Sequence, residues 1–79
     1  MVKQISLIHL RRRQSGRVIQ IMGGYGMIRR LSALGIRPGK RITKVSAMFM
    51  RGPVTVKVGG IEIALGFGMA SRIMVEVEE

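Results

Sequence analysis

The side chains that most often carry catalytic chemistry are scarce in this chain of 79 residues. It contains one histidine, His9, together with four glutamates, no aspartate and no cysteine. A catalytic nucleophile needs a neighbouring base and a further group that orients the base. Three of the four glutamates lie within the last four residues, away from the histidine. The sequence therefore predicts no catalytic residue and a protein that is not an enzyme.

Two side chains, His9 and Glu62, are weak candidates for a metal site. Imidazole is a common ligand of divalent metals, but a site needs several convergent ligands, and no carboxylate or thiol lies near His9 in the sequence. The seven methionines do not supply them, because thioether sulfur prefers soft Cu(I) whereas Fe²⁺ favours oxygen and nitrogen. A structural or surface histidine is the favoured interpretation. No cofactor is evident, and a weakly bound divalent metal is the alternative.

Positive charge is the main chemical property of the chain. The formal net charge is +10, and 13 of the 14 basic residues precede Glu62, the first acidic residue. Such a field attracts nucleic acid, anionic lipid headgroups or an acidic protein surface. Binders of single-stranded nucleic acid usually interleave aromatic and basic side chains, a pattern that the three aromatic residues here do not follow. Nucleic acid is therefore the less favoured partner.

Short strands separated by glycines are the elements that must position these charges. Alternating or β-branched segments predict strands at 17–22, 41–46, 54–58, 61–65 and 72–77. A short helix follows the first long strand, with an inward face of apolar residues at helical spacing: Met27, Ile28, Leu31 and Leu34. Strands of this number and length can close as a small barrel. The predicted fold is mainly β, a single domain over residues 1–79 built as a small SH3-like barrel of about five short strands with that helix inserted, and an OB-like barrel is the alternative.

Glycines and prolines predict the turns and the end of the helix. Gly35 stands where helices commonly close with a left-handed residue, and Pro38 prevents the helix from resuming. Pro38 followed by Gly39 suits a type II turn, and Gly59-Gly60 suits a two-residue hairpin turn. The barrel interior is expected to hold alternating β-branched residues, Val18, Ile42, Val56, Ile63 and Ile73, and gap-filling methionines, Met22, Met27, Met69 and Met74.

The order of these motifs resembles the ferrous iron transport protein A (FeoA) family. The central signature is Leu31-x-x-Leu34-Gly35-Ile36-x-Pro38-Gly39-x-x-Ile42. The later matches are the Gly52-Pro53-Val54 turn, the strand Gly60-Ile61-x-Ile63-Ala64-Leu65, and the closing Ala70-x-x-Ile73-x-Val75. The resemblance extends from about Ile5 to Val77. It implies an SH3-like domain that acts in ferrous iron uptake as a cytoplasmic accessory protein of FeoB, a membrane transporter with a GTPase domain.

Under this interpretation, the basic and apolar loops are the expected contacts with the transporter. Met48-Phe49-Met50 cannot all face one barrel interior, so we expect an exposed apolar contact there, with a partner or with a second copy of the chain. The predicted partner-binding residues are Arg11, Arg12, Arg13, Tyr25, Arg29, Arg30, Met48, Phe49 and Met50. A cytoplasmic location is expected, and a peripheral position at the inner face of the membrane is compatible with it. The competing functions are a small-barrel nucleic-acid-binding protein and a transition-metal-binding module.

Overall fold

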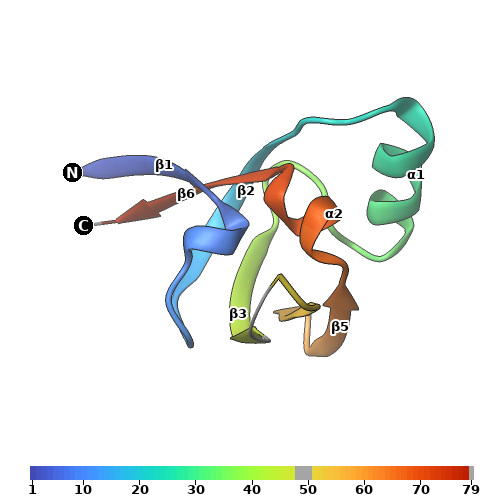
Figure 1. Ribbon diagram of the computed structural model, residues 1–79. Coiled ribbons are helices and arrows are strands. Elements are labelled where there is room, and N and C mark those ends of the chain that lie inside the picture. The colour runs from blue at the N-terminus through green and yellow to red at the C-terminus, as the bar shows by residue number, and fades with distance from the viewer. Residues whose placement is uncertain (48–50, 79) are drawn as a thin grey trace.

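A computed structural model describes residues 1–47 and 51–78 as one antiparallel sheet with short helical segments. The elements in chain order are β1 (Val2–Ser6), the 3-10 turn η1 (Leu7–His9), β2 (Ser15–Ile21), α1 (Tyr25–Ala33), β3 (Arg41–Ala47), β4 (Val54–Val58), β5 (Ile61–Leu65), α2 (Phe67–Ser71) and β6 (Ile73–Glu78). The strands of the described residues follow the order β1-β6-β2-β3-β4-β5 (Figure 1). The mainly β prediction is confirmed, and the described residues form six strands in place of about five.

The additional strand is β1, which pairs with β6 so that Val2 lies opposite Glu78. This pairing brings the two ends of the chain side by side, far from α1 (Figure 1). Most of β1 is exposed, and only its last two residues are partly buried. Because the strand has little inward face, its sequence lacks the alternation that predicts a half-buried strand.

The sheet bends at two irregular points of its register. The pairing shifts between Val18 and Gln20 where β2 meets β6, and between Lys44 and Ser46 where β3 meets β4. An extra residue in one strand increases its local bend and twist, which lets a short sheet curl around its core. Strands β2 and β6 also approach each other closely at Gly16. A Cβ atom at Gly16 would lie 3.0 Å from the carbonyl oxygen of Glu76.

The core is one cluster of apolar side chains drawn from the strands, η1, α2 and the end of α1. Its buried members are Leu7, Leu10, Val18, Ile21, Leu31, Ile36, Ile42, Val54, Val56, Val58, Leu65, Ala70, Ile73, Val75 and Val77. Four of the five predicted strand residues are buried, namely Val18, Ile42, Val56 and Ile73. Ile63 is only partly buried, because β5 is a terminal strand of the sheet.

The methionines contribute less to the core than we expected. Met27, Met69 and Met74 are partly buried. Met22 is 48% exposed, so the prediction that it is a core residue is wrong. Met22 follows the last residue of β2, and its backbone N–H donates to the carbonyl of Arg72 at 2.7 Å. The backbone of Met22 is therefore fixed while its side chain remains outside.

Helix α1 ends in a Schellman motif, in which Gly35 has the left-handed conformation that its position predicted. Gly35 has φ +90°, its N–H donates to the carbonyl of Ser32 at 2.9 Å, and the N–H of Ile36 donates to that of Leu31 at 2.9 Å. In this motif the residue after the glycine packs against the helix, and both Leu31 and Ile36 have no exposed surface. Leu34 is consequently turned outward and is 44% exposed, contrary to the predicted inward face.

The other predicted turns are present. Gly39 has φ +95°, and the N–H of Lys40 donates to the carbonyl of Arg37 at 3.1 Å, which gives the expected type II turn. Gly59 and Gly60 have φ +57° and +85° between the paired residues Val58 and Ile61. Two positive φ values are typical of a type I′ hairpin turn. Among the described residues, no helix is both long and apolar enough to cross a membrane.

Candidate functional site

Three arginines project from the tight turn between η1 and β2, residues Arg11–Gln14, which we call the basic loop. Arg11, Arg12 and Arg13 are all exposed, as predicted. The turn is closed locally, because the N–H of Gln14 donates to the carbonyl of Arg11 at 2.9 Å and the N–H of Arg11 donates to Oε1 of Gln14 at 2.8 Å. Arg13 has φ +71°, a conformation that costs a non-glycine residue energy.

Lys44 on β3 fixes the backbone of the basic loop, a role that the sequence analysis missed. Its Nζ donates to the carbonyl of Leu10 at 2.8 Å and to that of Ile8 at 3.0 Å. Its own carbonyl accepts from the N–H of Arg13 at 2.7 Å. Lys44 is 9% exposed, and this burial lowers the pKa of its ammonium group. The lysine is thus a structural anchor beneath the exposed arginines.

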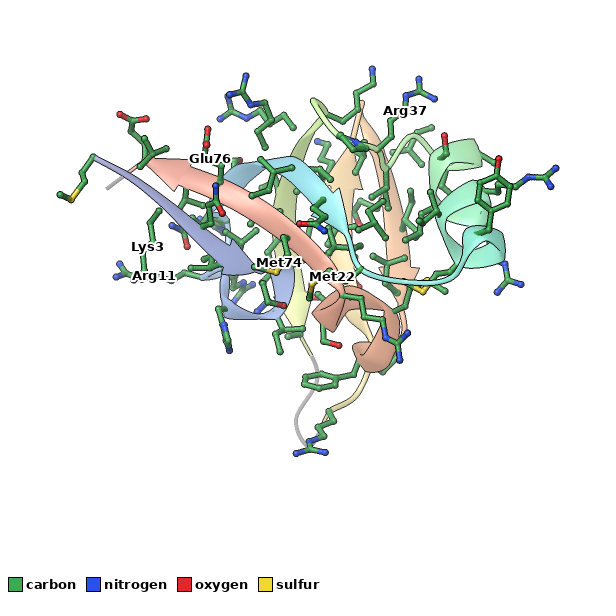
Figure 2. All side chains as sticks on the ribbon, turned by 90° about the horizontal axis from the view of Figure 1, so that it is seen from above. Lys3, Arg11, Met22, Arg37, Met74 and Glu76 are labelled. Carbon is green, nitrogen blue, oxygen red and sulfur yellow. The ribbon has the colours of Figure 1, made fainter. Side chains whose placement is uncertain are left out.

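The predicted contact residues on α1 do not join the basic loop in one surface. Tyr25 on α1 is 78% exposed, and the guanidinium of Arg29 lies 5.9 Å from the centre of its ring, within the range of a cation–π contact. Arg30 is also exposed on this helix. Figure 2 shows Arg11 at the end of the molecule opposite α1. The predicted contacts Met48, Phe49 and Met50 lie outside the described residues.

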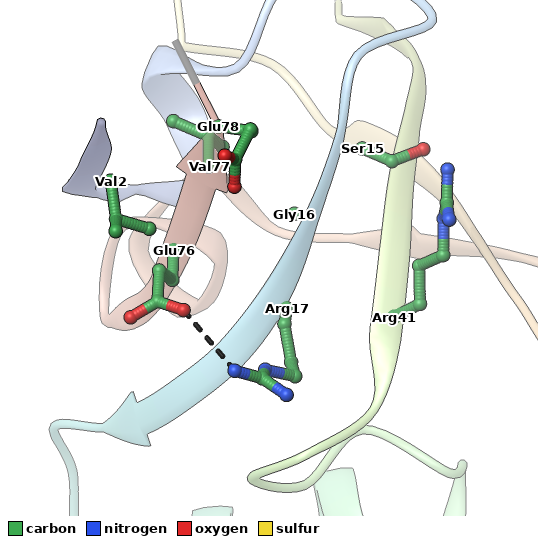
Figure 3. Close-up of a pocket in the computed structure, with 8 residues that line it drawn as sticks. All are labelled: Val2, Ser15, Gly16, Arg17, Arg41, Glu76, Val77 and Glu78. Carbon is green, nitrogen blue, oxygen red and sulfur yellow. Dashed lines mark hydrogen bonds and ion pairs between the residues drawn. The ribbon is translucent and has the colours of Figure 1, made fainter.

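One hollow of about 370 Å³ lies over β2 and β6 and contains charges of both signs. Arg17 donates to a carboxylate oxygen of Glu76 at 3.2 Å (Figure 3). Glu78 and Arg41 also line this hollow. The lining thus carries two carboxylates and two guanidinium groups, which balance in formal charge, although the side chain of Arg41 points away from that of Arg17 (Figure 3).

A second hollow, of about 410 Å³, contains the predicted metal candidate His9. His9 is exposed at the end of η1 and lines this hollow together with Glu78, Lys3 and Arg11. Glu62 lies elsewhere, on β5 opposite Lys57 of β4. In the described parts of the chain, no three His, Cys, Asp or Glu side chains gather where they could hold a metal ion.

A third hollow, of about 400 Å³, lies between the end of α1 and the β4–β5 turn, and we call it the helix-end groove. Leu34, Val58 and Ile61 supply its apolar surface, and Ile61 is 64% exposed. Three cationic side chains line the same groove, and its described lining contains no carboxylate: Arg37, Lys40 and Arg41. This combination of exposed apolar and uniformly basic side chains distinguishes the groove from the other two hollows.

The groove is a product of the turns that the sequence predicted, although the groove itself was not predicted. The Schellman motif directs Leu34 outward, and the type II turn brings Arg37 and Lys40 together. A Cβ atom added at Gly35 would lie 3.7 Å from Cγ1 of Val58, so the helix end lies against the hairpin. The available sequence signal was three basic residues within the five positions 37–41; the exposure of Leu34 was not visible in the sequence.

The other motif residues have structural places. Ala70 is fully buried in α2, Gly60 completes the hairpin turn, and Gly52 is partly buried before β4. Pro53 and Ala64 are exposed. These positions shape turns and strand ends and bring no further ionisable group to the three hollows.

Comparison with known proteins identifies the family. The model of the FeoA domain matches residues 5–77. A relative from Methanocaldococcus jannaschii, a candidate Fe(2+) transport protein A, is 37% identical over 62 residues, which cover 78% of this chain and 73% of the relative.

Two solved structures show the same fold. A crystal structure of FeoA, described as an iron uptake regulatory protein, has a TM-score of 0.82 and 33% identity and covers 92% of this chain and 95% of its own. FeoA of Stenotrophomonas maltophilia, described as an SH3 domain protein complexed with zinc, has a TM-score of 0.74 and 28% identity, covering 90% and 88% of the two chains. The SH3-like prediction is confirmed, and this chain belongs to the FeoA family of ferrous iron transport proteins.

Proposed function

We propose that this protein is a cytoplasmic, non-enzymatic accessory protein of ferrous iron uptake that binds the cytoplasmic GTPase domain of the FeoB transporter. Family membership supports a role in ferrous iron transport. The positive charge is the observation that supports binding to this partner. The net charge is +10, and the basic side chains of the basic loop and of the helix-end groove are exposed. Such a surface accelerates the encounter with an acidic partner.

Surface plasmon resonance with the immobilised GTPase domain of FeoB from the same genome tests this function. We expect saturable binding with an association rate that falls as salt rises, because exposed charges are screened beyond about 8 Å at physiological ionic strength. A generic single-stranded RNA immobilised in a parallel channel is the control. Tight binding to RNA without binding to the GTPase domain would replace the proposed function by the nucleic-acid one.

A further inference from the structure

We propose that the helix-end groove is a docking site for a protein segment in which a leucine-sized apolar side chain is flanked by aspartate or glutamate. This inference rests on the proposed function, because it takes the partner to be a protein, and it names the chemistry of the segment that is recognised. The groove, rather than the basic loop, determines which segment is held.

The apolar part of the groove gives the segment its anchor. Leu34 and Ile61 are 44% and 64% exposed, and Val58, which is buried at the end of β4, lines the same groove. Exposed large apolar side chains beside a hollow mark binding sites more often than isolated ones do. A leucine-sized side chain of the partner would occupy only part of this open space of about 400 Å³, which leaves room for the flanking residues of the segment.

The charged part of the groove determines what must flank the anchor. Arg37, Lys40 and Arg41 line it without a carboxylate in the described lining. Arg41 also lies directly opposite Arg17 in the β2–β3 pairing, and like charges in this position destabilise a sheet. Glu76 neutralises Arg17 at 3.2 Å. The side chains of Arg17 and Arg41 point apart (Figure 3), so a carboxylate of the partner at Arg41 would neutralise the second arginine.

The composition of the groove argues against the other polyanions. Proteins that bind single-stranded nucleic acid usually supply aromatic side chains on which the bases stack, and the described lining has none. An amphipathic surface binds an anionic membrane by laying a broad apolar face into the headgroup region, whereas Leu34, Val58 and Ile61 line a hollow. Carboxylates on a peptide match guanidinium groups with charge-assisted hydrogen bonds. An acidic segment with an apolar centre therefore satisfies both halves of the groove.

In the test, the ¹⁵N-labelled 79-residue chain is titrated with a synthetic peptide in which two leucines are flanked on both sides by aspartates. Binding is measured from the NMR chemical shifts of the backbone amides. Gly35, Gly59 and Ile61 report on the groove, and the amides of Arg11 and Arg12 report on the basic loop. Two control peptides replace the leucines by serine or the aspartates by asparagine. We expect the parent peptide to shift the groove amides and both controls to bind at least about tenfold more weakly, since each loses one half of the recognition.

Matched variants locate the binding. Lys40→Gln with Arg41→Gln should raise the Kd of the parent peptide about tenfold, whereas Arg11→Gln with Arg12→Gln removes the same charge and should change it by less than about twofold at physiological salt. Ile61→Thr should weaken binding several-fold, and Val2→Thr, the same kind of change on the other terminal strand, should not. Unchanged melting temperatures would show that the variants fold.

Three results would overturn the inference: shifts confined to the basic loop, equal binding of the leucine and serine peptides, or groove shifts caused by anionic vesicles or RNA but not by the peptide. The GTPase domain of FeoB separates this inference from the proposed function. If the domain binds the wild type and Ile61→Thr equally, the assignment of the groove as a docking site is wrong and the proposed function stands. If the peptide shifts the groove amides but the GTPase domain does not bind, the groove remains a docking site and the proposed function is wrong.

Discussion

The basic loop and the helix-end groove each present three cationic side chains, but they differ in what surrounds those charges. The loop is a tight turn whose backbone is fixed by Lys44 and whose arginines are exposed. The groove adds exposed Leu34 and Ile61 to its charges. Charge alone accelerates encounter, whereas charge combined with a shaped apolar surface also prolongs a complex. We therefore expect the loop to control association and the groove to control dissociation.

Truncation of the buried leucine at the end of α1, next to the groove, should have the largest effect on the free energy of unfolding. Leu31 is fully buried at the end of α1, so Leu31→Ala should lower the free energy of unfolding by about 2–5 kcal/mol through lost burial and a cavity. Leu34→Ala is the matched control three residues later and should cost far less, because Leu34 is 44% exposed. Urea unfolding measures both. Equal losses would show that Leu34 also belongs to the core.

The turn that shapes the groove gives the next largest effect. Gly35 has φ +90°, so Gly35→Ala should lower the free energy of unfolding by about 1–2 kcal/mol. Gly26 lies in α1 with open space where a Cβ atom would be placed, and Gly26→Ala should instead stabilise by about 0.5 kcal/mol. Thermal unfolding should shift in opposite directions for the two variants. A shift in the same direction would contradict the left-handed assignment of Gly35.

The ionisation of Lys44, which lies beneath the basic loop, should have a smaller effect on the free energy of unfolding, and this effect should depend on pH. Burial lowers the pKa of Lys44 below its ordinary value of 10.5, so just below that pH the unfolded chain binds more protons than the folded one. The free energy of unfolding should therefore rise with pH in this window. Lys44→Met cannot bind this proton. The difference in free energy of unfolding between this variant and the wild type, measured with urea, should therefore change with pH over the same range. A difference that stays constant with pH would show that the ionisation of Lys44 does not contribute to stability.

Local sequence patterns predicted most of the fold and the turns around the groove, but not the surfaces. The Schellman end at Gly35 and the hairpin at Gly59-Gly60 depend on neighbouring residues, which the sequence displays directly. Strand β1 was missed because it is mostly exposed, and Ile63 was placed too deep because sheet order is not a local property. The groove joins residues 34–41 to residues 58–61, a contact that periodicity cannot reveal. Lys44 was missed although it follows Ile42 by two residues and so shares the inward face of its strand, because lysine is almost never buried without a partner and its partners, the carbonyls of Ile8 and Leu10, are distant in the sequence.

The most direct test of the division between the two regions is stopped-flow kinetics with the GTPase domain of FeoB over a salt series. The triple variant Arg11→Gln, Arg12→Gln and Arg13→Gln should slow association several-fold at low salt, have little effect at high salt, and leave dissociation unchanged. Ile61→Thr should speed dissociation several-fold at every salt concentration and leave association unchanged. If the triple variant binds with unchanged rates at low salt, or if Ile61→Thr leaves dissociation unchanged, the assignment of encounter to the loop and of retention to the groove is contradicted.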